Sequence, residues 1–193
     1  MNQTLVNILS ILKEFEGIIG AVLGSTVTLV VTDILRHKGK LKIYVPNFEL
    51  KLDFEENFSE KKNSEREIRG ITIRYKIQIY NGSDICKIMR DFKIRFYNGK
   101  NVLFTQIPRD EATRHFLSHI SFVDDMEVAN IAPHEIAVID QSCYLHKNDV
   151  DFEKMSLVNN IVLGFIDEKD KKHSVMLQTK QLNINEMHAA MKD

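Results

Sequence analysis

The chain begins with a long apolar run and then changes to an alternation of apolar and polar positions. From Gly17 to Thr32 there are 16 consecutive uncharged residues, and Ile34 and Leu35 extend the apolar run past Asp33. A membrane-spanning helix needs about 20 mostly apolar residues, with a lower limit near 17. The run reaches this length if Asp33 lies at the membrane interface. It therefore predicts a short, single transmembrane helix.

Small residues recur four positions apart within this run. Such spacing places them along one face of a helix, where the backbones of two helices can approach closely. We therefore predict a helix–helix contact through two series of small residues, Gly17, Ala21 and Ser25 in one and Gly20, Gly24 and Thr28 in the other. The alternative is that these residues are present because small residues are common in membrane spans.

Charges on the two sides of the run predict its orientation. One basic residue, Lys13, precedes the run, and four Lys or Arg residues follow it: Arg36, Lys38, Lys40 and Lys42. By the positive-inside rule, the amino terminus lies outside and the remainder in the cytoplasm of a cell-membrane protein. We expect these four residues to contact anionic lipid, and Gly39 to end the helix as a left-handed cap.

Two other interpretations of the run remain open. A cleaved signal peptide needs a basic segment at its start, whereas the first basic residue here is Lys13. A soluble protein could instead bury the run as its first helix, although an amphipathic helix would show polar residues every three or four positions.

From Leu41 onward, apolar residues recur with period two, which indicates β-strands. Pro46-Asn47 shifts the phase of the first strand and predicts a bulge in an edge strand, and Asn98-Gly99 predicts a hairpin. We expect residues 71–107 to form a three-stranded meander and 55–67 to form an exposed loop. The predicted strands cover 41–45, 48–54, 71–80, 88–97, 102–107, 135–140, 157–166 and 174–182.

Many short strands with few helices predict a mainly β protein. The fold class is an N-terminal single transmembrane helix followed by an immunoglobulin-like antiparallel β-sandwich. The predicted divisions are 1–40 for the anchor helix, 41–183 for the sandwich and 184–193 for a C-terminal tail or short helix. The Cys–Trp–Cys pattern of immunoglobulins is missing, because the chain contains no Trp.

The segment between Arg109 and Asp125 is the best candidate for chemistry. A helix over 109–118 would place Glu111, His115 and His119 on one face, which makes them weak candidates for a metal site. The zinc motif HExxH is not present, because Phe116 follows His115. Long loops on sandwiches often carry recognition, but we favour the alternative that the apolar residues of this segment cover one end of the core.

Composition narrows the function classes. Lys plus Arg total 26 and Asp plus Glu total 27, a net charge of -1, which argues against nucleic-acid binding. Two cysteines are too few for a disulfide scaffold or a four-cysteine zinc site. No Ser or Cys lies in a glycine-rich elbow of the kind that nucleophilic hydrolases use. We therefore expect no enzyme activity and no cofactor.

The leading hypothesis is a membrane-anchored cytoplasmic β-sandwich that acts as a non-enzymatic protein-interaction or sensing module. One alternative is an oligomerising membrane effector, similar to bacterial defence or toxin proteins, which the sandwich gates. The other is a metal-dependent hydrolase that uses Glu111, His115 and His119. The expected partners are the membrane and either another protein or a second copy of the chain.

Overall fold

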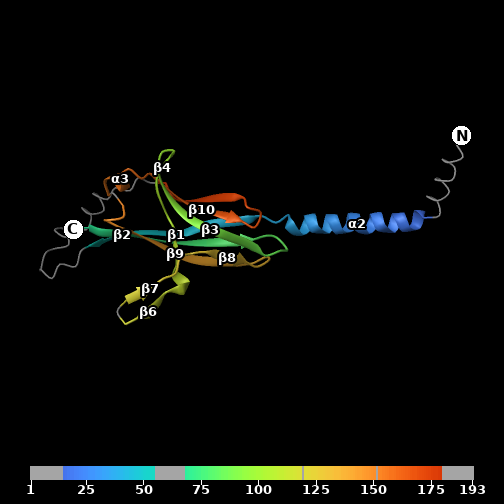
Figure 1. Cartoon of the computed structure of the whole chain (residues 1–193), viewed down its shortest axis with the longest axis horizontal. Helices are drawn as coiled ribbons and strands as arrows, with labels where there is room; N and C mark the ends of the chain where they lie inside the picture. The colour runs from blue at the N-terminus through green and yellow to red at the C-terminus, as the bar shows by residue number, and fades with distance from the viewer. Residues whose placement is uncertain (1–14, 55–67, 119, 151, 180–193) are drawn as a thin grey trace.

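The computed structural model describes residues 15–54, 68–118, 120–150 and 152–179 of the chain. Within these ranges, one long helix leads into a β-sandwich made of two antiparallel sheets (Figure 1). The sandwich confirms the predicted fold class. The predicted exposed loop at 55–67 and the predicted C-terminal segment at 184–193 lie outside the described residues.

Helix α2 (Glu16–His37) confirms the predicted apolar helix. It extends from one end of the sandwich, and none of its residues is buried within the described structure (Figure 1). The predicted left-handed cap at Gly39 is wrong, because among the described glycines only Gly99 has a positive φ. Gly39 lies instead against the backbone of Gly82 and Ser83, where a side chain would not fit. The glycine is needed for close approach of two backbones, not for a turn.

Within the described residues, the strands of the sandwich form two sheets, and two short helices and a separate pair of strands lie outside them. The first sheet has the spatial order β1 (Leu41–Phe54), β2 (Ile68–Asn81), β9 (Ile136–His146) and β5 (Arg109–Asp110). The second has the order β11 (Lys172–Gln178), β10 (Asn160–Asp167), β3 (Lys87–Asn98) and β4 (Asn101–Gln106), and β8 (Val128–Ile131) also pairs with β3. Outside these sheets lie the short helices η2 (Glu111–Thr113) and α3 (Phe152–Ser156) and the paired strands β6 (His115–Leu117) and β7 (Ile120–Phe122).

The core lies between the sheets, and the period-two pattern explains its composition. On β2 the inward residues are completely buried, and their neighbours along the strand point outward, as the alternation predicted. Strand β1 is an edge strand, and its register with β2 shifts between Tyr44 and Asn47, which confirms the bulge predicted at the proline. The fully buried side chains of β2 are Ile71, Ile73, Tyr75, Ile77 and Ile79.

The predicted three-stranded meander over 71–107 is wrong. The hairpin between β3 and β4 is present, with Gly99 at φ 59°, but β2 and β3 belong to different sheets. The segment between them crosses from one sheet to the other. Asn81 is buried at this crossing, and its side-chain amide donates to the carbonyls of Ile85, Ile131 and Ala132. This side chain replaces the backbone pairing that a hairpin would supply.

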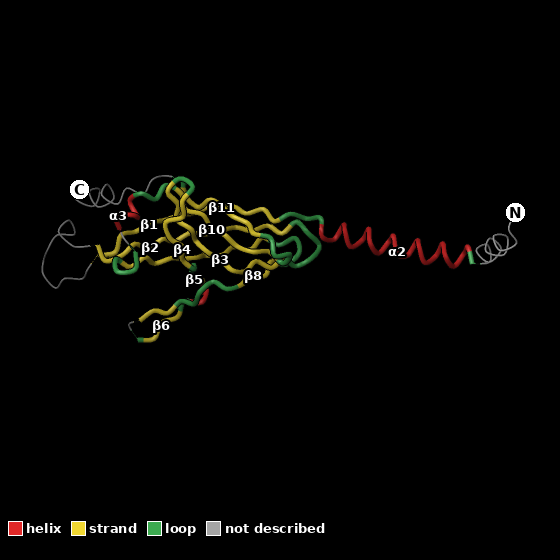
Figure 2. The backbone as a smooth tube through the Cα atoms, turned by 45° about the horizontal axis from the view of Figure 1, so that its top comes forward, coloured by secondary structure: helices red, strands yellow, loops and turns green. Residues whose placement is uncertain are grey.

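The predicted helix over Arg109–Ser118 is also wrong. The chain forms strand β5 and the single turn η2, and then the β6–β7 hairpin, which stands away from the sandwich (Figure 2). Two backbone hydrogen bonds hold the base of the segment that carries this hairpin. The nitrogen of Asp110 donates to the carbonyl oxygen of Asp124 at 2.9 Å, and the nitrogen of Met126 donates to that of Pro108 at 2.7 Å. Spacing of four along this sequence therefore did not correspond to a helix face.

Candidate functional site

Backbone hydrogen bonds connect the end of the sandwich next to α2 to the helix end and to the residues that follow it. The backbone nitrogen of Asp84 donates to the carbonyl oxygen of Arg36, and that of Gly82 donates to the carbonyl oxygen of Lys40, each at 3.3 Å. Together with the close approach at Gly39, these bonds connect the helix end to the β2–β3 crossing. The basic residues that follow the helix therefore have a defined position beside the sandwich.

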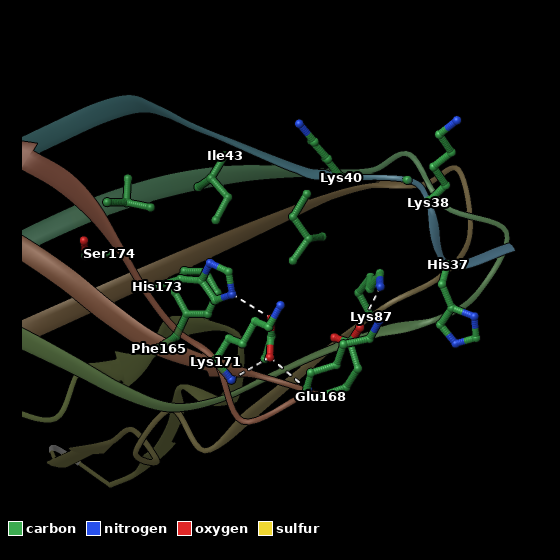
Figure 3. Close-up of a pocket in the computed structure, with 15 residues that line it drawn as sticks. His37, Lys38, Lys40, Ile43, Lys87, Phe165, Glu168, Lys171, His173 and Ser174 are labelled. Carbon is green, nitrogen blue, oxygen red and sulfur yellow. Dashed lines mark hydrogen bonds and ion pairs between the residues drawn. The ribbon is translucent and has the colours of Figure 1, made fainter. Parts of the chain in front are cut away.

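A pocket of about 730 Å³ opens at this end, between the edge strand β1 and the β10–β11 turn (Figure 3). Its inner wall is apolar, because the inward residues of β1 are only partly buried here. Ile43 from β1 and Phe165 from β10 face the hollow from opposite sides (Figure 3). The residues that form the apolar wall are Leu41, Ile43, Phe165 and Val175.

Charged groups surround the apolar wall, and the two carboxylates among them already have partners. The Lys87 ammonium donates to Glu168 at 2.6 Å, and both side chains are largely buried. Asp167 accepts a bond from His173 at 2.7 Å and from the backbone nitrogens of Lys169 and Lys171. Burial alone would raise the pKa of Asp167, but these hydrogen bonds outweigh it and lower the pKa below its ordinary value.

Half of the predicted basic cluster lines this pocket. Lys38 and Lys40 lie on its rim, whereas Arg36 and Lys42 are not part of its lining. That these four residues contact lipid stays a prediction. The sequence analysis missed the other lysines of the pocket, Lys87, Lys169 and Lys171. Lys169 and Lys171 lie in the turn between β10 and β11, and the proximity of this turn to the helix depends on the pairing of β10 with β3.

A second, polar pocket of about 500 Å³ lies near β5 and η2, and it contains Glu111. The Glu111 carboxylate accepts hydrogen bonds from Arg74 at 2.5 Å and from Arg114 at 2.6 Å and 2.7 Å. The bonds from Arg114 are the largest influence, and with those from Ser142 and Arg74 they outweigh burial and lower the pKa of Glu111 to about 2. Two guanidinium groups thus occupy the oxygens that a metal ion would need.

The geometry predicted for the metal candidates is not present. Without a helix over 109–118, Glu111 and His115 do not share a helix face, and His119 lies outside the described residues. The ring of His115 interacts with the carbonyl oxygen of Thr113 at 3.0 Å and stacks on Phe122. Among the residues that the structure describes, no three His, Cys, Asp or Glu side chains are grouped so that they could hold a metal ion.

The β6–β7 hairpin exposes its apolar side chains, which corrects our expectation that they cover the core. Phe116, Leu117 and Ile120 are 72%, 69% and 63% exposed, and Phe122 is 43% exposed. A two-stranded hairpin is at best marginally stable alone in water. This one is held at its base, where Arg114 donates to the hydroxyl of Ser121 at 3.0 Å. The hairpin therefore presents an uncovered apolar surface.

The small residues of α2 also face open space. A side chain added at Gly17, Gly20 or Gly24 would meet nothing within 4 Å. The hydroxyls of Ser25 and Thr28 donate back to helix carbonyls, at 2.9 Å and 2.8 Å. Such bonds satisfy polar groups within the helix, as lipid requires. Contact of a second helix with this face, including Ala21, stays a prediction.

Cys143 does not have the environment of a nucleophile. Cys86 and Cys143 are unpaired thiols, and Cys143 is buried. Burial raises the pKa of Cys143 to about 12. A thiol is reactive as its thiolate, so a thiol with such a high pKa is inert near neutral pH.

Comparison with known proteins identifies relatives of the sandwich. A protein of Bacillus subtilis strain 168, the uncharacterized YopI derived from prophage SPβ, is 33% identical over 174 residues, which cover 89% of this chain and 97% of that protein. Among solved structures, the putative ApaA protein of Bordetella pertussis has a TM-score of 0.32 at 10% identity and covers 75% of this chain and 94% of that one.

A further solved structure, an uncharacterized β-sandwich protein of Clostridium difficile 630, also has a TM-score of 0.32, at 12% identity, with 72% of this chain and 86% of that one covered. Both TM-scores are below 0.5, so neither structure informs on function. The family model described as the YopI Ig-like domain matches residues 39–178, which include every described strand of the sandwich. The chain therefore belongs to the YopI Ig-like domain family.

Proposed function

We propose that this protein is a single-pass membrane protein whose sandwich lies in the cytoplasm and binds a protein partner without catalysis. The observation that carries the proposal is the exposure of α2, whose 22 residues are long and apolar enough to cross a membrane while none is buried. A helix that is apolar all round is normally covered by protein or by lipid. The described part of this chain does not cover it.

Charge and hydrogen bonding support this placement of α2. Asp33, the acidic residue near the end of the apolar run, has its carboxylate 3.4 Å from the Nδ1 atom of His37 one turn later, and its carbonyl oxygen lies 2.8 Å from the same atom. Arg36 and Lys38 follow directly, and cations at this end favour the cytoplasmic side. The hydrogen bond from the backbone nitrogen of Asp84 to the carbonyl oxygen of Arg36 then keeps this end of the sandwich close to the inner surface.

The β6–β7 hairpin is the surface that we assign to the protein partner. It lies away from the end of the sandwich that carries α2, and therefore away from the proposed membrane surface (Figures 1 and 2). Exposed aromatic and aliphatic side chains in one cluster are typical of protein interfaces. Phe116 and Leu117 would be the anchors that enter an apolar pocket of the partner.

Topology of the full chain tests the anchoring. We would place a reporter at each end, wash the membranes at alkaline pH and measure the intact mass of the chain. The expected result is an unprocessed protein that resists extraction, with its carboxyl end in the cytoplasm. Extraction by the wash, or a mass that shows removal of the first residues, would contradict anchoring by α2.

Site-specific photo-crosslinking in cells tests the partner surface. A photoreactive residue in place of Phe116 should give a defined protein adduct. The matched control is the same residue in place of Ile136 on β9, an apolar position that is 63% exposed but lies outside the hairpin. The same adducts from both positions, or none from position 116, would exclude the hairpin as the docking surface.

A further inference from the structure

We propose that the pocket beside α2 binds the phosphate-bearing headgroup of an anionic membrane lipid. The inference deepens the proposed function, because it requires α2 to place this end of the sandwich at the membrane surface. It adds the chemical class of a ligand and the residues that bind it.

The pocket has the two kinds of surface that an amphiphile needs. Its apolar wall, on which Ile43 and Phe165 face each other, lies inside the hollow, and lysines lie around the opening (Figure 3). A volume of about 730 Å³ is within the range of small-ligand pockets, which is roughly 300–1,000 Å³. A headgroup with its glycerol backbone could occupy this space, with its first methylene groups against the apolar wall.

The charge of the pocket favours an anion. Five lysines and two carboxylates line it, which leaves an excess of three positive charges. The carboxylates already have partners, because Glu168 pairs with Lys87 and Asp167 accepts hydrogen bonds from His173 and from two backbone nitrogens. In the described part of the chain no ion-pair partner is found for the other lysines, which are Lys38, Lys40, Lys169 and Lys171. Lysine ammonium groups are common ligands of phosphate.

The lysines approach from two separate parts of the chain. Lys38 and Lys40 lie on the rim and point away from the hollow (Figure 3). Their four-carbon stems rotate freely, so these amines can turn toward a ligand. Lys169 and Lys171 belong to the β10–β11 turn, whose backbone is held by Asp167. The turn therefore presents its lysines on a fixed backbone opposite the helix end.

The position of the pocket selects a lipid over a free phosphate. Its lining begins with His37, the last residue of α2, and continues through Lys40 into β1. If α2 crosses the membrane, this opening lies at the level of the headgroups. Inorganic phosphate would use the lysines but would leave the apolar wall unoccupied, whereas a lipid uses both.

Native mass spectrometry of the delipidated full chain in a neutral detergent tests the inference. The probes are short-chain phosphatidylglycerol and short-chain phosphatidylcholine, with glycerol phosphate as a soluble competitor. The test variant is Lys169→Gln with Lys171→Gln, and its matched control is Arg36→Gln with Lys42→Gln. Both variants remove two positive charges near the helix end, but only the first changes the pocket lining.

The expected result is one bound phosphatidylglycerol per chain and at least about tenfold weaker binding of phosphatidylcholine. The Lys169/Lys171 variant should lose about tenfold or more in affinity, and the Arg36/Lys42 variant less than about threefold. Equal losses of affinity in both variants would show that the lipid is attracted by the general positive charge near the helix end. That result would overturn the pocket as the binding site. Equal binding of phosphatidylcholine, or competition by glycerol phosphate as strong as that of the lipid, would overturn an anionic lipid as the ligand.

Two features keep this test independent of other failures. Thermal unfolding of each variant reports its folding, and the single variant Lys171→Gln replaces the double one if the latter unfolds at lower temperature. Short-chain lipids bind in solution, so this assay does not require anchoring by α2. Lipid binding by a protein that the alkaline wash removes would contradict the proposed function alone, and a firmly anchored protein that binds no lipid would contradict this inference alone.

Discussion

Strand β2 and helix α2 are both rich in aliphatic side chains, yet the two elements differ in how far these side chains are buried. The inward side chains of β2 are completely buried between the sheets, and no residue of α2 is buried. Burial of a large aliphatic side chain contributes about 1.5–3 kcal/mol to folding. The side chains of β2 therefore stabilise the sandwich, whereas those of α2 require a membrane or another helix for burial.

The β6–β7 hairpin resembles α2 in this respect. Its apolar side chains also lie outside the core, although its base is held by hydrogen bonds to the sandwich. The comparison separates apolar segments that stabilise the fold from apolar segments that stay exposed and can contact a membrane or another protein. Substitutions in the first group should change stability, and substitutions in the second should change association.

The largest effect should come from shortening a core side chain. Ile77→Ala on β2 removes fully buried methylene and methyl groups, and we expect a loss of about 2–5 kcal/mol in the free energy of unfolding. The matched change Val30→Ala on α2 should alter the unfolding of the sandwich by less than about 0.5 kcal/mol. Denaturant titration of both variants in detergent measures this, and similar losses would mean that α2 packs on the sandwich.

A smaller effect is expected at the junction between the two regions. Gly39→Ala adds a methyl group that overlaps the backbone of Gly82, so the connection of α2 to the β2–β3 crossing must shift. We expect a loss of about 1–3 kcal/mol in stability. Gly24→Ala is the control, because its methyl group meets open space. An unchanged midpoint of thermal unfolding for Gly39→Ala would show that the junction is loose.

The base of the hairpin should show a pH-dependent effect. The pKa of Glu111 is lowered from 4.5 to about 2, so its ion pairs stabilise the fold fully above pH 4.5 and are lost as the pH falls toward 2. Arg74 and Arg114 are partly exposed, which weakens the pairs, and we expect Glu111→Gln to cost about 1–2 kcal/mol at pH 7.

Denaturant unfolding of the wild type and of Glu111→Gln across this pH range measures the difference. The gap between the two proteins should close as the pH approaches 2. A constant gap would show that the ionised carboxylate of Glu111 does not stabilise the fold.

The smallest effect on stability should accompany the change in α2 that tests self-association. Gly20→Leu with Gly24→Leu should leave the unfolding of the sandwich unchanged, because both glycines face open space. If the small-residue face joins copies of the chain, crosslinking in membranes should show a loss of oligomers. Loss of a membrane-damaging activity at the same time would favour the effector alternative over a simple anchor, and oligomers that persist would contradict a contact through this face.

Much of the fold could be predicted from the sequence because local patterns carry it. The alternation over 71–80 identified β2, the proline marked the bulge in β1, and Asn98-Gly99 marked the hairpin between β3 and β4. The site could be predicted only in part. Lys38 and Lys40 were expected to act with Arg36 and Lys42, but the pocket combines them with lysines more than 40 residues away in the chain.

The sequence by itself determined the apolar helix, the periods of the strands and the charge that follows the helix. Those properties depend on residues that are neighbours along the chain. Only the tertiary structure decided that β2 and β3 lie in different sheets, because the buried Asn81 bonds to carbonyls up to 51 residues away. It also decided that β6 and β7 form an exposed hairpin, since Glu111 at its base bonds to Arg74 on β2. Such pairings join distant segments, and no local pattern of residues specifies them.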